Sequence, residues 1–345
     1  MRAHQIVASQ QPAELREVPL PEPGPGEVLV KVGGAGLCHS DLHMMHLPSA
    51  VPEPYTLGHE TAGWVEAVGP GVSGWDHGEP VIVHGAWGCG RCRRCHADLE
   101  QYCETVVAAN APRGSGLGRH GGMADYLLVP AARHLVPLGD LDPRIWAPLD
   151  DAALTPYHAL KRVAHLCTPD NWVMVQGIGG LGHAAVQLVK TLTGARVVAV
   201  DIDDDKLTMA AALGADAVVR GDADDAALHV RDVTGGQGVA VVLDCVGTDA
   251  TMRLASQAVH SLSHIVVIGI GLGTLPFGYL HVPFGTTVSS TFWGTVTELR
   301  ELIALTNAGR FELHVEQIAL ADVADGYRRL EAGQVQGRLV ALPHG

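Results

Sequence analysis

The chain lacks the features of membrane and nucleic-acid-binding proteins. Its 345 residues contain no apolar run of about 18 residues or more, the length that a membrane-spanning helix needs. The first residues show no basic stretch followed by an apolar segment and a cleavage site, so we expect no export signal. Only 23 Lys and Arg stand against 37 Asp and Glu, and the net charge of −14 would repel a phosphate backbone. We therefore expect neither a membrane nor a nucleic acid as a partner.

Cysteine is also scarce, and its distribution is uneven. Four of the seven cysteines lie within fifteen positions at CxxCxxCxxxxxxxC spacing, namely Cys89, Cys92, Cys95 and Cys103. Four thiolates can enclose one zinc ion in a tetrahedron, which leaves no position open for chemistry. We predict a structural zinc lobe over residues 88–104. Grouped thiols without an even scatter of further cysteines indicate a reducing compartment, so we expect a cytoplasmic protein.

The composition and the hydrophobic pattern of the sequence change along the chain. The first third is rich in Gly and Pro and has short β-patterned runs at 28–36, 60–69 and 80–86, which predict a β-rich module containing the cysteine lobe. From about Asn171, nearly continuous apolar strands alternate with amphipathic helices, as expected for a parallel sheet buried on both faces. This pattern predicts a doubly wound α/β domain. Two helix-like stretches and a last strand, 337–343, are expected to return to the first module.

A glycine-rich turn joins the first of these strands to a helix. The segment GIGGLG contains Gly177, Gly179, Gly180 and Gly182, and in this context a pyrophosphate can rest against the amino end of the helix. Asp201 ends the next strand, where its carboxylate can accept hydrogen bonds from both hydroxyls of an adenosine ribose. Residues 202–205 contain no arginine that could neutralise a 2′-phosphate. We predict NAD, not NADP, as the cofactor. A zinc-ribbon binding module would explain neither the turn nor Asp201.

A second set of metal-ligating residue types is dispersed along the chain. Cys38, His59 and one carboxylate from Asp150 or Asp151 would supply three ligands and leave a fourth position open, which is the coordination of a catalytic zinc. Spacing alone does not select between the two carboxylates.

The motifs GLCHSD and GHE, the four-cysteine segment, the GIGGLG turn and Asp201 occur in an order that resembles the zinc-dependent medium-chain alcohol dehydrogenases. The resemblance covers nearly the whole chain and is closest to the bacterial NAD-dependent secondary-alcohol branch. It implies a GroES-like catalytic domain over 1–152, a NAD-binding Rossmann domain over 153–290 and a C-terminal return over 291–345. It also implies a homo-oligomer, a dimer or a tetramer, with residues 271–285 as a candidate edge strand.

The resemblance also implies the catalytic metal site. Cys38 and His59 become zinc ligands, and Glu60 becomes a neighbouring or alternate ligand. Many relatives have a cysteine as third ligand where this chain reads PLDDAALTPYHA; alignment through Thr155 puts Asp151 there, with Asp150 as its competitor. Asp41 is expected to accept the other ring N–H of His59.

Further roles follow from the same resemblance. Ser40 and His43 are expected to carry the alcohol proton to solvent. The expected cofactor contacts beyond the glycines and Asp201 are His39, Thr155, Leu181, Lys206, Ile268, Ile270 and Arg338. The expected substrate pocket consists of Trp87, Leu117, Leu280 and Trp293.

The implied activity is reversible, NAD-linked oxidation of secondary alcohols to ketones, extending to primary alcohols and aldehydes, with two zinc ions per subunit. The alternative is a polyol dehydrogenase on the same scaffold. Large apolar side chains at the pocket positions favour hydrophobic alcohols over polyols.

Overall fold

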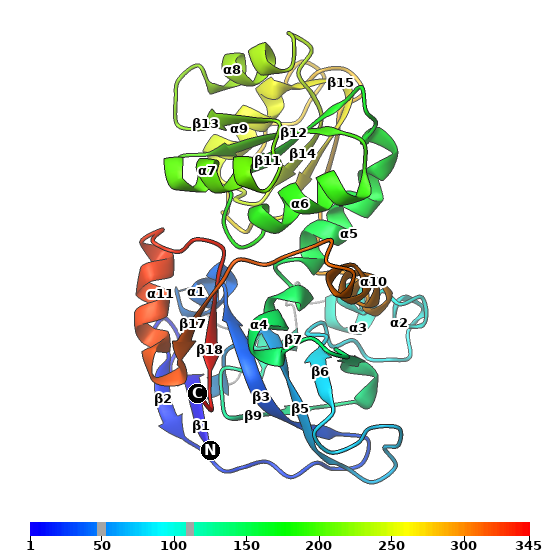
Figure 1. Ribbon diagram of the computed structural model, residues 1–345, viewed down its shortest axis with the longest axis vertical. Coiled ribbons are helices and arrows are strands. Elements are labelled where there is room, and N and C mark those ends of the chain that lie inside the picture. Colours follow the sequence, from blue (N-terminus) through cyan, green and yellow to red (C-terminus); the bar gives the residue numbers. More distant parts are fainter. Residues whose placement is uncertain (47–52, 108–113) are drawn as a thin grey trace. The chain divides into compact units, whose positions relative to one another are not determined.

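The computed structural model describes residues 1–46, 53–107 and 114–345, which form two compact units (Figure 1). The first unit comprises Met1–Leu154, Trp293–Gly309 and Leu313–Gly345, and the second comprises Thr155–Phe292 and Arg310–Glu312. The chain thus leaves the first unit after residue 154 and returns to it at residue 293. Within the described residues, no helix is long and apolar enough to cross a membrane.

The second unit is built on a six-stranded parallel sheet in the order β13-β12-β11-β14-β15-β16. Its strands are β11 (Trp172–Gln176), β12 (Arg196–Asp201), β13 (Ala217–Arg220), β14 (Val239–Asp244), β15 (Val259–Val267) and β16 (Thr287–Ser290). Every residue of β11 and β14 is buried, which explains their unbroken apolar sequences. The strand order reverses direction beside β11, so the predicted doubly wound Rossmann sheet is confirmed.

Helices connect these strands and cover the sheet (Figure 1). They are α5 (Leu154–Val163), α6 (Gly182–Leu192), α7 (Asp204–Ala212), α8 (Ala226–Val233) and α9 (Asp249–Ala258), with a 3-10 turn, η4 (Ala164–Leu166), after α5. Local sequence fixes their starts: the Asp203 carboxylate accepts two backbone N–H groups at the start of α7, and Thr248 and Thr251 form a capping box on α9.

The predicted edge strand at 271–285 is wrong. This stretch forms turns and irregular backbone, and the edge strand of the sheet is β16. Four glycines and two prolines interrupt the segment, so a regular ladder cannot form. At its start, Gly273 packs so closely on residues 247–249 that a Cβ there would lie 2.3 Å from the Thr248 backbone.

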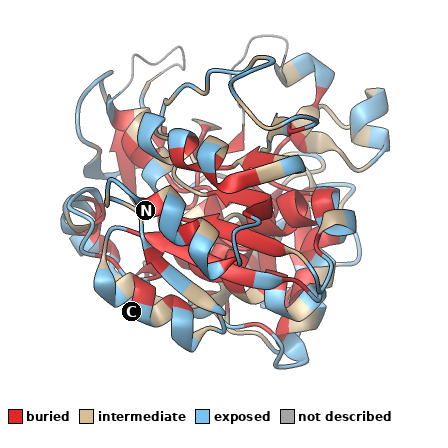
Figure 2. Cartoon of the chain, turned by 90° about the horizontal axis from the view of Figure 1, so that it is seen from above, coloured by how far each residue is buried: buried red, intermediate tan, exposed pale blue. Residues whose placement is uncertain are grey.

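The first unit contains a seven-stranded mixed sheet, with the path β10-β6-β5-β3-β18-β17 and with β9 also paired to β3. These strands are β3 (Val28–Leu37), β5 (Glu60–Val68), β6 (Pro80–Val83), β9 (Tyr126–Val129), β10 (Leu135–Pro137), β17 (Val315–Ala319) and β18 (Arg338–Leu342). Two small sheets add β1 (Arg2–Ile6), β2 (Glu14–Glu17) and β4 (Tyr55–Thr56), and β7 (Gly114–Ser115) with β8 (Gly118–Arg119). The inner strands are largely buried, red in Figure 2.

Short helices surround this sheet. They are α1 (His39–His46), α2 (Arg93–His96), α3 (Glu104–Val107), α4 (Pro143–Trp146), α10 (Val296–Asn307) and α11 (Val323–Glu331), with 3-10 turns η1 (Glu100–Tyr102), η2 (Ala132–His134), η3 (Ala147–Asp150) and η5 (Leu320–Asp322). The C-terminal return matters most for the site. Strand β18 pairs antiparallel with β3 through Leu339 and Leu37, which brings Arg338 beside the end of β3.

Candidate functional site

The four clustered cysteines converge in the first unit. The Sγ atom of Cys92 lies 3.5 Å from that of Cys95 and 3.9 Å from that of Cys103, and the Sγ atoms of Cys89 and Cys95 are 4.0 Å apart. Zinc–thiolate bonds of about 2.3 Å in a tetrahedron separate the sulfur atoms by about 3.8 Å. The cluster therefore has the dimensions of a closed zinc site.

The ionisation of these thiols also fits a metal. A hydrogen bond from the Arg91 backbone, followed by one involving Thr105, lowers the pKa of Cys89 to about 6. Burial instead raises the pKa of Cys95 to about 12. Four thiolates in this volume thus need a cation to share their charge, and Zn²⁺ supplies it.

A second cluster brings Cys38, His59 and Asp151 together, with ligand atoms all within 4.8 Å of one another. Asp151 Oδ2 lies 3.4 Å from His59 Nε2 and 3.7 Å from Cys38 Sγ. Ligands at about 2.0–2.3 Å from one zinc ion are separated by distances of this order. Cys38 and His59 are buried and Asp151 is partly exposed. One thiolate, one imidazole and one carboxylate can hold a zinc ion and leave a fourth position open.

Local structure fixes each of these side chains. Cys38 lies between the end of β3 and the start of α1, His59 directly precedes β5, and Asp151 follows η3. The ring of His59 is oriented by Asp41, because its Nδ1–H donates to Asp41 Oδ1 at 3.2 Å and leaves Nε2 facing Asp151. The predicted Asp41–His59 contact is thus present.

Asp41 is itself held by two further donors. Its Oδ2 atom accepts hydrogen bonds from the backbone N–H of Cys38 and from the Tyr327 hydroxyl, each at 3.0 Å. Tyr327 belongs to α11, in the C-terminal return, and is buried. One carboxylate therefore links both Cys38 and His59 to a helix almost 300 residues further along the chain.

Glu60 and Arg338 form a buried ion pair beside this cluster. Arg338 Nη2 donates to Glu60 Oε1 at 2.6 Å and Arg338 Nε donates to Oε2 at 3.0 Å, while Nη2 also lies 3.3 Å from Asp151 Oδ2. Burial raises the pKa of Glu60 to about 7, and the charge of Arg338 opposes that shift. The pair needs Gly36, since a Cβ there would lie 1.8 Å from Glu60 Oε2. The structure thus places Glu60 against Arg338 and outside the three-residue cluster.

Asp150 faces a different environment from Asp151. His84 Nδ1–H donates to Asp150 Oδ1 at 3.0 Å, and the backbone N–H of Gly85 donates to Oδ2 at 2.8 Å. Burial raises the pKa of Asp150, while the bonds and charge of His84 lower it. Both oxygens of Asp150 are thereby occupied, and Asp151 is the carboxylate that faces Cys38 and His59.

The residues predicted for proton transfer lie close by on α1. Ser40 Oγ lies 3.7 Å from Cys38 Sγ. His43 is partly buried, and its Nδ1 atom has no hydrogen-bond partner among the described residues. Burial, and then the neighbouring His46, lowers the pKa of His43. His39, predicted to contact the cofactor, is exposed at the first position of α1.

Three of the four predicted pocket residues, Trp87, Leu117 and Trp293, are buried in the first unit. The Trp293 ring meets the His59 ring edge-on, with centroids 5.9 Å apart and an interplanar angle of 85°. Trp293 has a φ of 47°, a left-handed conformation that is rare for a bulky residue. Leu280, in the second unit, is 86% exposed.

The glycine-rich turn has the geometry of a phosphate-binding loop. Gly177 has a φ of +81°, and a Cβ on Gly182 would lie 1.9 Å from the Gly177 carbonyl oxygen, so both positions need glycine. A Cβ on Gly179 would instead meet nothing within 4 Å. The loop therefore leaves open space at Gly179, directly before the amino end of α6. Gly180 and Leu181 complete the turn, with Leu181 at the N-cap.

Asp201 closes this loop from the next strand. Its Oδ2 atom accepts the backbone N–H of Ile178 at 2.6 Å, and its Oδ1 atom accepts the N–H of Ile202 at 2.7 Å. The other predicted cofactor residues of the second unit are spread around the same sheet: Thr155 and Ile268 are buried, Lys206 is partly buried on α7, and Ile270 is 48% exposed.

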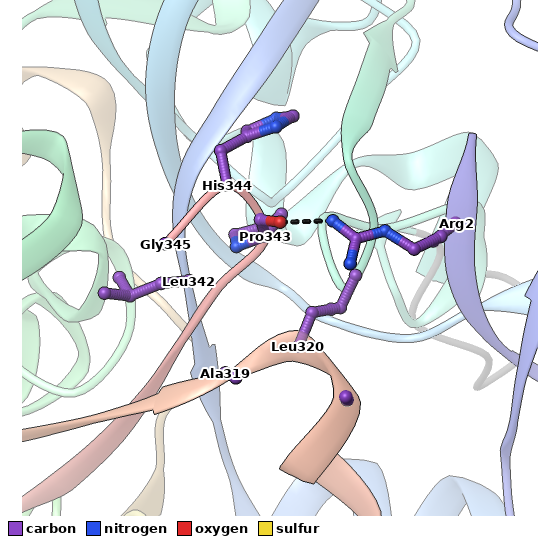
Figure 3. Close-up of a pocket in the computed structure, with 8 residues that line it drawn as sticks. Arg2, Ala319, Leu320, Leu342, Pro343, His344 and Gly345 are labelled. Carbon is purple, nitrogen blue, oxygen red and sulfur yellow. Dashed lines mark hydrogen bonds between the residues drawn. The ribbon is translucent and has the colours of Figure 1, made fainter.

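A separate surface pocket lies near the C-terminal strand, with a volume of about 480 Å³. Figure 3 shows its lining, in which Arg2 donates to the carbonyl oxygen of Pro343 beside Leu320 and His344. None of the predicted site residues lines this pocket, so it is distinct from both metal clusters.

Sequence reasoning missed Tyr327, His84 and the Glu60–Arg338 pair. Their partners are separated by 286, 66 and 278 positions, and no short motif joins them. The burial of Asp150, which requires a partner such as His84, is visible only in the structure.

Comparison with known proteins agrees with this geometry. Residues 24–140 match the alcohol dehydrogenase GroES-like domain, and residues 180–308 match the zinc-binding dehydrogenase family. The chain is 30% identical to a NAD-dependent alcohol dehydrogenase of Sulfurisphaera tokodaii, over 99% of this chain and 100% of the relative.

Two solved structures are similar over nearly their whole length. An alcohol dehydrogenase from the archaeon Aeropyrum pernix has a TM-score of 0.92 and 34% identity, covering 99% of this chain and 100% of that one. An acetophenone reductase from Geotrichum candidum, in complex with NAD, has a TM-score of 0.87 and 32% identity, covering 99% and 97%. The chain therefore belongs to the zinc-dependent medium-chain alcohol dehydrogenase family.

Proposed function

We propose that the protein is a zinc- and NAD-dependent alcohol dehydrogenase that oxidises secondary alcohols to ketones reversibly, and primary alcohols to aldehydes. The observation that carries this conclusion is the convergence of Cys38, His59 and Asp151 on one point with a coordination position left over. The relatives named for alcohol oxidation, and the ketone reductase with its NAD, support the reaction and the cofactor.

Some residues of the chain are metal ligands, and others orient those ligands. Cys38, His59 and Asp151 would hold the catalytic zinc, and Asp41 keeps Nε2 of His59 available to it. When bound, zinc acts as a Lewis acid on the alcohol or carbonyl oxygen, and NAD accepts or returns the hydride. The cysteine lobe holds the second zinc and stabilises its loop.

Ser40 and His43 carry the alcohol proton. The Ser40 hydroxyl lies beside Cys38 Sγ, so it can form a hydrogen bond with the hydroxyl of an alcohol substrate. His43 is neutral at neutral pH because burial lowers its pKa, and a neutral imidazole can take up a proton and release it to solvent.

The second unit binds the dinucleotide. The open space at Gly179 accommodates the pyrophosphate at the start of α6, and Asp201 accepts hydrogen bonds from the adenosine ribose. The acidic run Asp203, Asp204 and Asp205 would repel a 2′-phosphate, so NAD is preferred over NADP. The remaining contacts that we propose in this unit are Thr155, Lys206, Ile268 and Ile270.

In the first unit, the substrate side is formed by Trp87, Leu117 and Trp293. Two indole rings and a leucine supply apolar area, which suits hydrophobic alcohols and ketones better than polyols.

We further propose a cytoplasmic homo-oligomer. Among the described residues, β16 is an edge strand of the parallel sheet, and the exposed side chains of Phe277, Tyr279, Leu280 and Phe284 lie in the segment that precedes it. None of the seven cysteines, all within the described residues, forms a disulfide, which suits a reducing compartment. Light scattering would give the number of subunits.

The test is NADH formation from 2-alkanols, primary alcohols and polyols, with NAD and NADP in parallel. We expect the highest kcat/KM with a 2-alkanol and NAD. A preference for a polyol would instead assign the alternative activity, and the absence of turnover with every alcohol would contradict the proposal. The Cys38→Ala variant should lose turnover and keep one zinc per chain.

A further inference from the structure

Asp150 and Asp151 are consecutive carboxylates that are held by different elements. Asp150 is fully buried and His84 is 1% exposed. Both oxygens of Asp150 are bound by consecutive residues just after β6, since His84 Nδ1–H donates to Oδ1 at 3.0 Å and the Gly85 N–H donates to Oδ2 at 2.8 Å. Asp150 is thus fixed in position and direction by two hydrogen bonds.

The segment that supplies these donors is itself immobilised. The backbone N–H of His84 donates to the His134 carbonyl at 2.7 Å, and Trp87 Nε1–H donates to the His84 carbonyl at 2.9 Å. A Cβ added at Gly85 would lie 2.5 Å from the Trp293 ring and 2.9 Å from the His59 carbonyl oxygen. The donors of Asp150 therefore sit directly against the backbone of a proposed zinc ligand.

Asp151 faces the metal cluster and Arg338. Its Oδ2 atom lies 3.3 Å from Arg338 Nη2, 3.4 Å from His59 Nε2 and 3.7 Å from Cys38 Sγ, and its side chain is 15% exposed. It follows the last residue of η3, where the backbone leaves the helical turn. Asp150 and Asp151 share a peptide bond, so the anchoring of Asp150 constrains this peptide from one side. The backbone N–H of Ala152, which donates to Glu60 Oε1 at 3.0 Å, holds the next peptide from the other side.

We propose that His84 is a positioning residue for the catalytic zinc: through Asp150 it anchors the peptide that carries Asp151, so that Asp151 meets His59 and Cys38 at ligand distance. This inference rests on the proposed function, because it assumes zinc at that cluster. The partners that orient metal ligands typically change metal affinity about 10- to 100-fold when they are removed.

The test compares zinc affinity in four variants, measured by chelator competition on the full chain. His84→Leu removes the donor, and we expect the catalytic zinc to bind about 10- to 100-fold more weakly while the cysteine lobe keeps its zinc. His84→Asn keeps a donor near the place of Nδ1, and we expect affinity close to that of the unaltered protein.

A double variant separates positioning from simple stability. Replacing both members of a buried polar pair by apolar residues often restores stability. We therefore expect His84→Leu with Asp150→Leu to recover the melting temperature of the unaltered protein but to retain the zinc defect. Recovery of zinc affinity together with melting temperature would show that the pair only stabilises the fold, and would overturn the inference.

His4 provides a matched control. It is a buried histidine of the same unit, and its Nε2 atom bonds to the Leu320 carbonyl at 2.8 Å, away from the metal cluster. His4→Leu should lower the melting temperature and leave zinc affinity unchanged; an equal zinc defect in this variant would count against a specific role for His84.

Failure of the inference and failure of the proposed function are distinguishable. If the unaltered protein binds two zinc ions and oxidises an alcohol, but His84→Leu binds zinc normally, only the role of His84 is refuted. If the unaltered protein binds a single zinc ion, the catalytic site itself is refuted, and the inference falls with it.

Discussion

Replacing Arg338 by Met should destabilise the first unit strongly. The guanidinium is 3% exposed and bonds in a fork to Glu60, which is fully buried, and also to Asp151. The substitution removes the cation and leaves two carboxylates close together without it. Breaking a buried ion pair from one side typically costs about 3–5 kcal/mol.

This free energy converts to a measurable shift in melting temperature. The first unit has about 200 residues, and in a unit of that size each kcal/mol lowers the Tm by about 2–4 °C. We therefore expect a decrease of roughly 6–20 °C in zinc-loaded protein, followed by circular dichroism.

Arg329 offers the control, because it also binds both oxygens of a glutamate, but at the surface. Its two Nη atoms lie 2.7 Å from the two oxygens of Glu316, and the side chains are 30% and 44% exposed. Exposed pairs contribute about 0–1 kcal/mol, so Arg329→Met should lower the Tm by a few degrees at most. An equal decrease in Tm for the two variants would refute the view that burial makes the Glu60–Arg338 pair contribute more to the free energy of unfolding.

Three further predictions follow from other contacts. Tyr327→Phe removes one donor to Asp41 and should lower the affinity for the catalytic zinc by about tenfold, measured by chelator competition. Unchanged affinity would show that the other donors to Asp41 suffice. Asp201→Ala should lower kcat/KM for NAD more than for NADP in steady-state assays, because it removes the ribose acceptor; an equal loss for both would contradict its role in cofactor choice. Burial raises the pKa of Asp216, but the hydrogen bond from Lys190 and further contacts lower it by more, so the net shift is downward. The ionised carboxylate therefore stabilises the fold at neutral pH, and this contribution is lost as pH falls below the usual aspartate range. Asp216→Asn should therefore lower the Tm at neutral pH and lose that effect in acid, and a pH-independent difference would rule out the linkage.

The strands of both units could be predicted because local sequence determines them. The runs at β3, β5 and β6 and the buried strands of the parallel sheet have the apolar patterns that their burial requires. The four-cysteine lobe and the glycine turn were also local, since all their residues lie within a short segment.

The contact of Asp41 with His59 was implied by the resemblance, but the rest of the support around the metal cluster could not be predicted, because it depends on the return of the chain. Arg338 meets Glu60 only because β18 pairs with β3, and Tyr327 reaches Asp41 only because α11 packs on α1. The segment 271–285 shows the opposite failure: the resemblance suggested an edge strand there, but the glycines and prolines of this chain determined its backbone.

The most direct test of the account is a crystal structure with anomalous scattering measured at the zinc edge. We predict two zinc peaks per chain: one enclosed by Cys89, Cys92, Cys95 and Cys103, and one bound by Cys38, His59 and Asp151. A chain fully loaded with zinc that showed no peak at the second cluster, or a peak bound by Asp150 in place of Asp151, would contradict it.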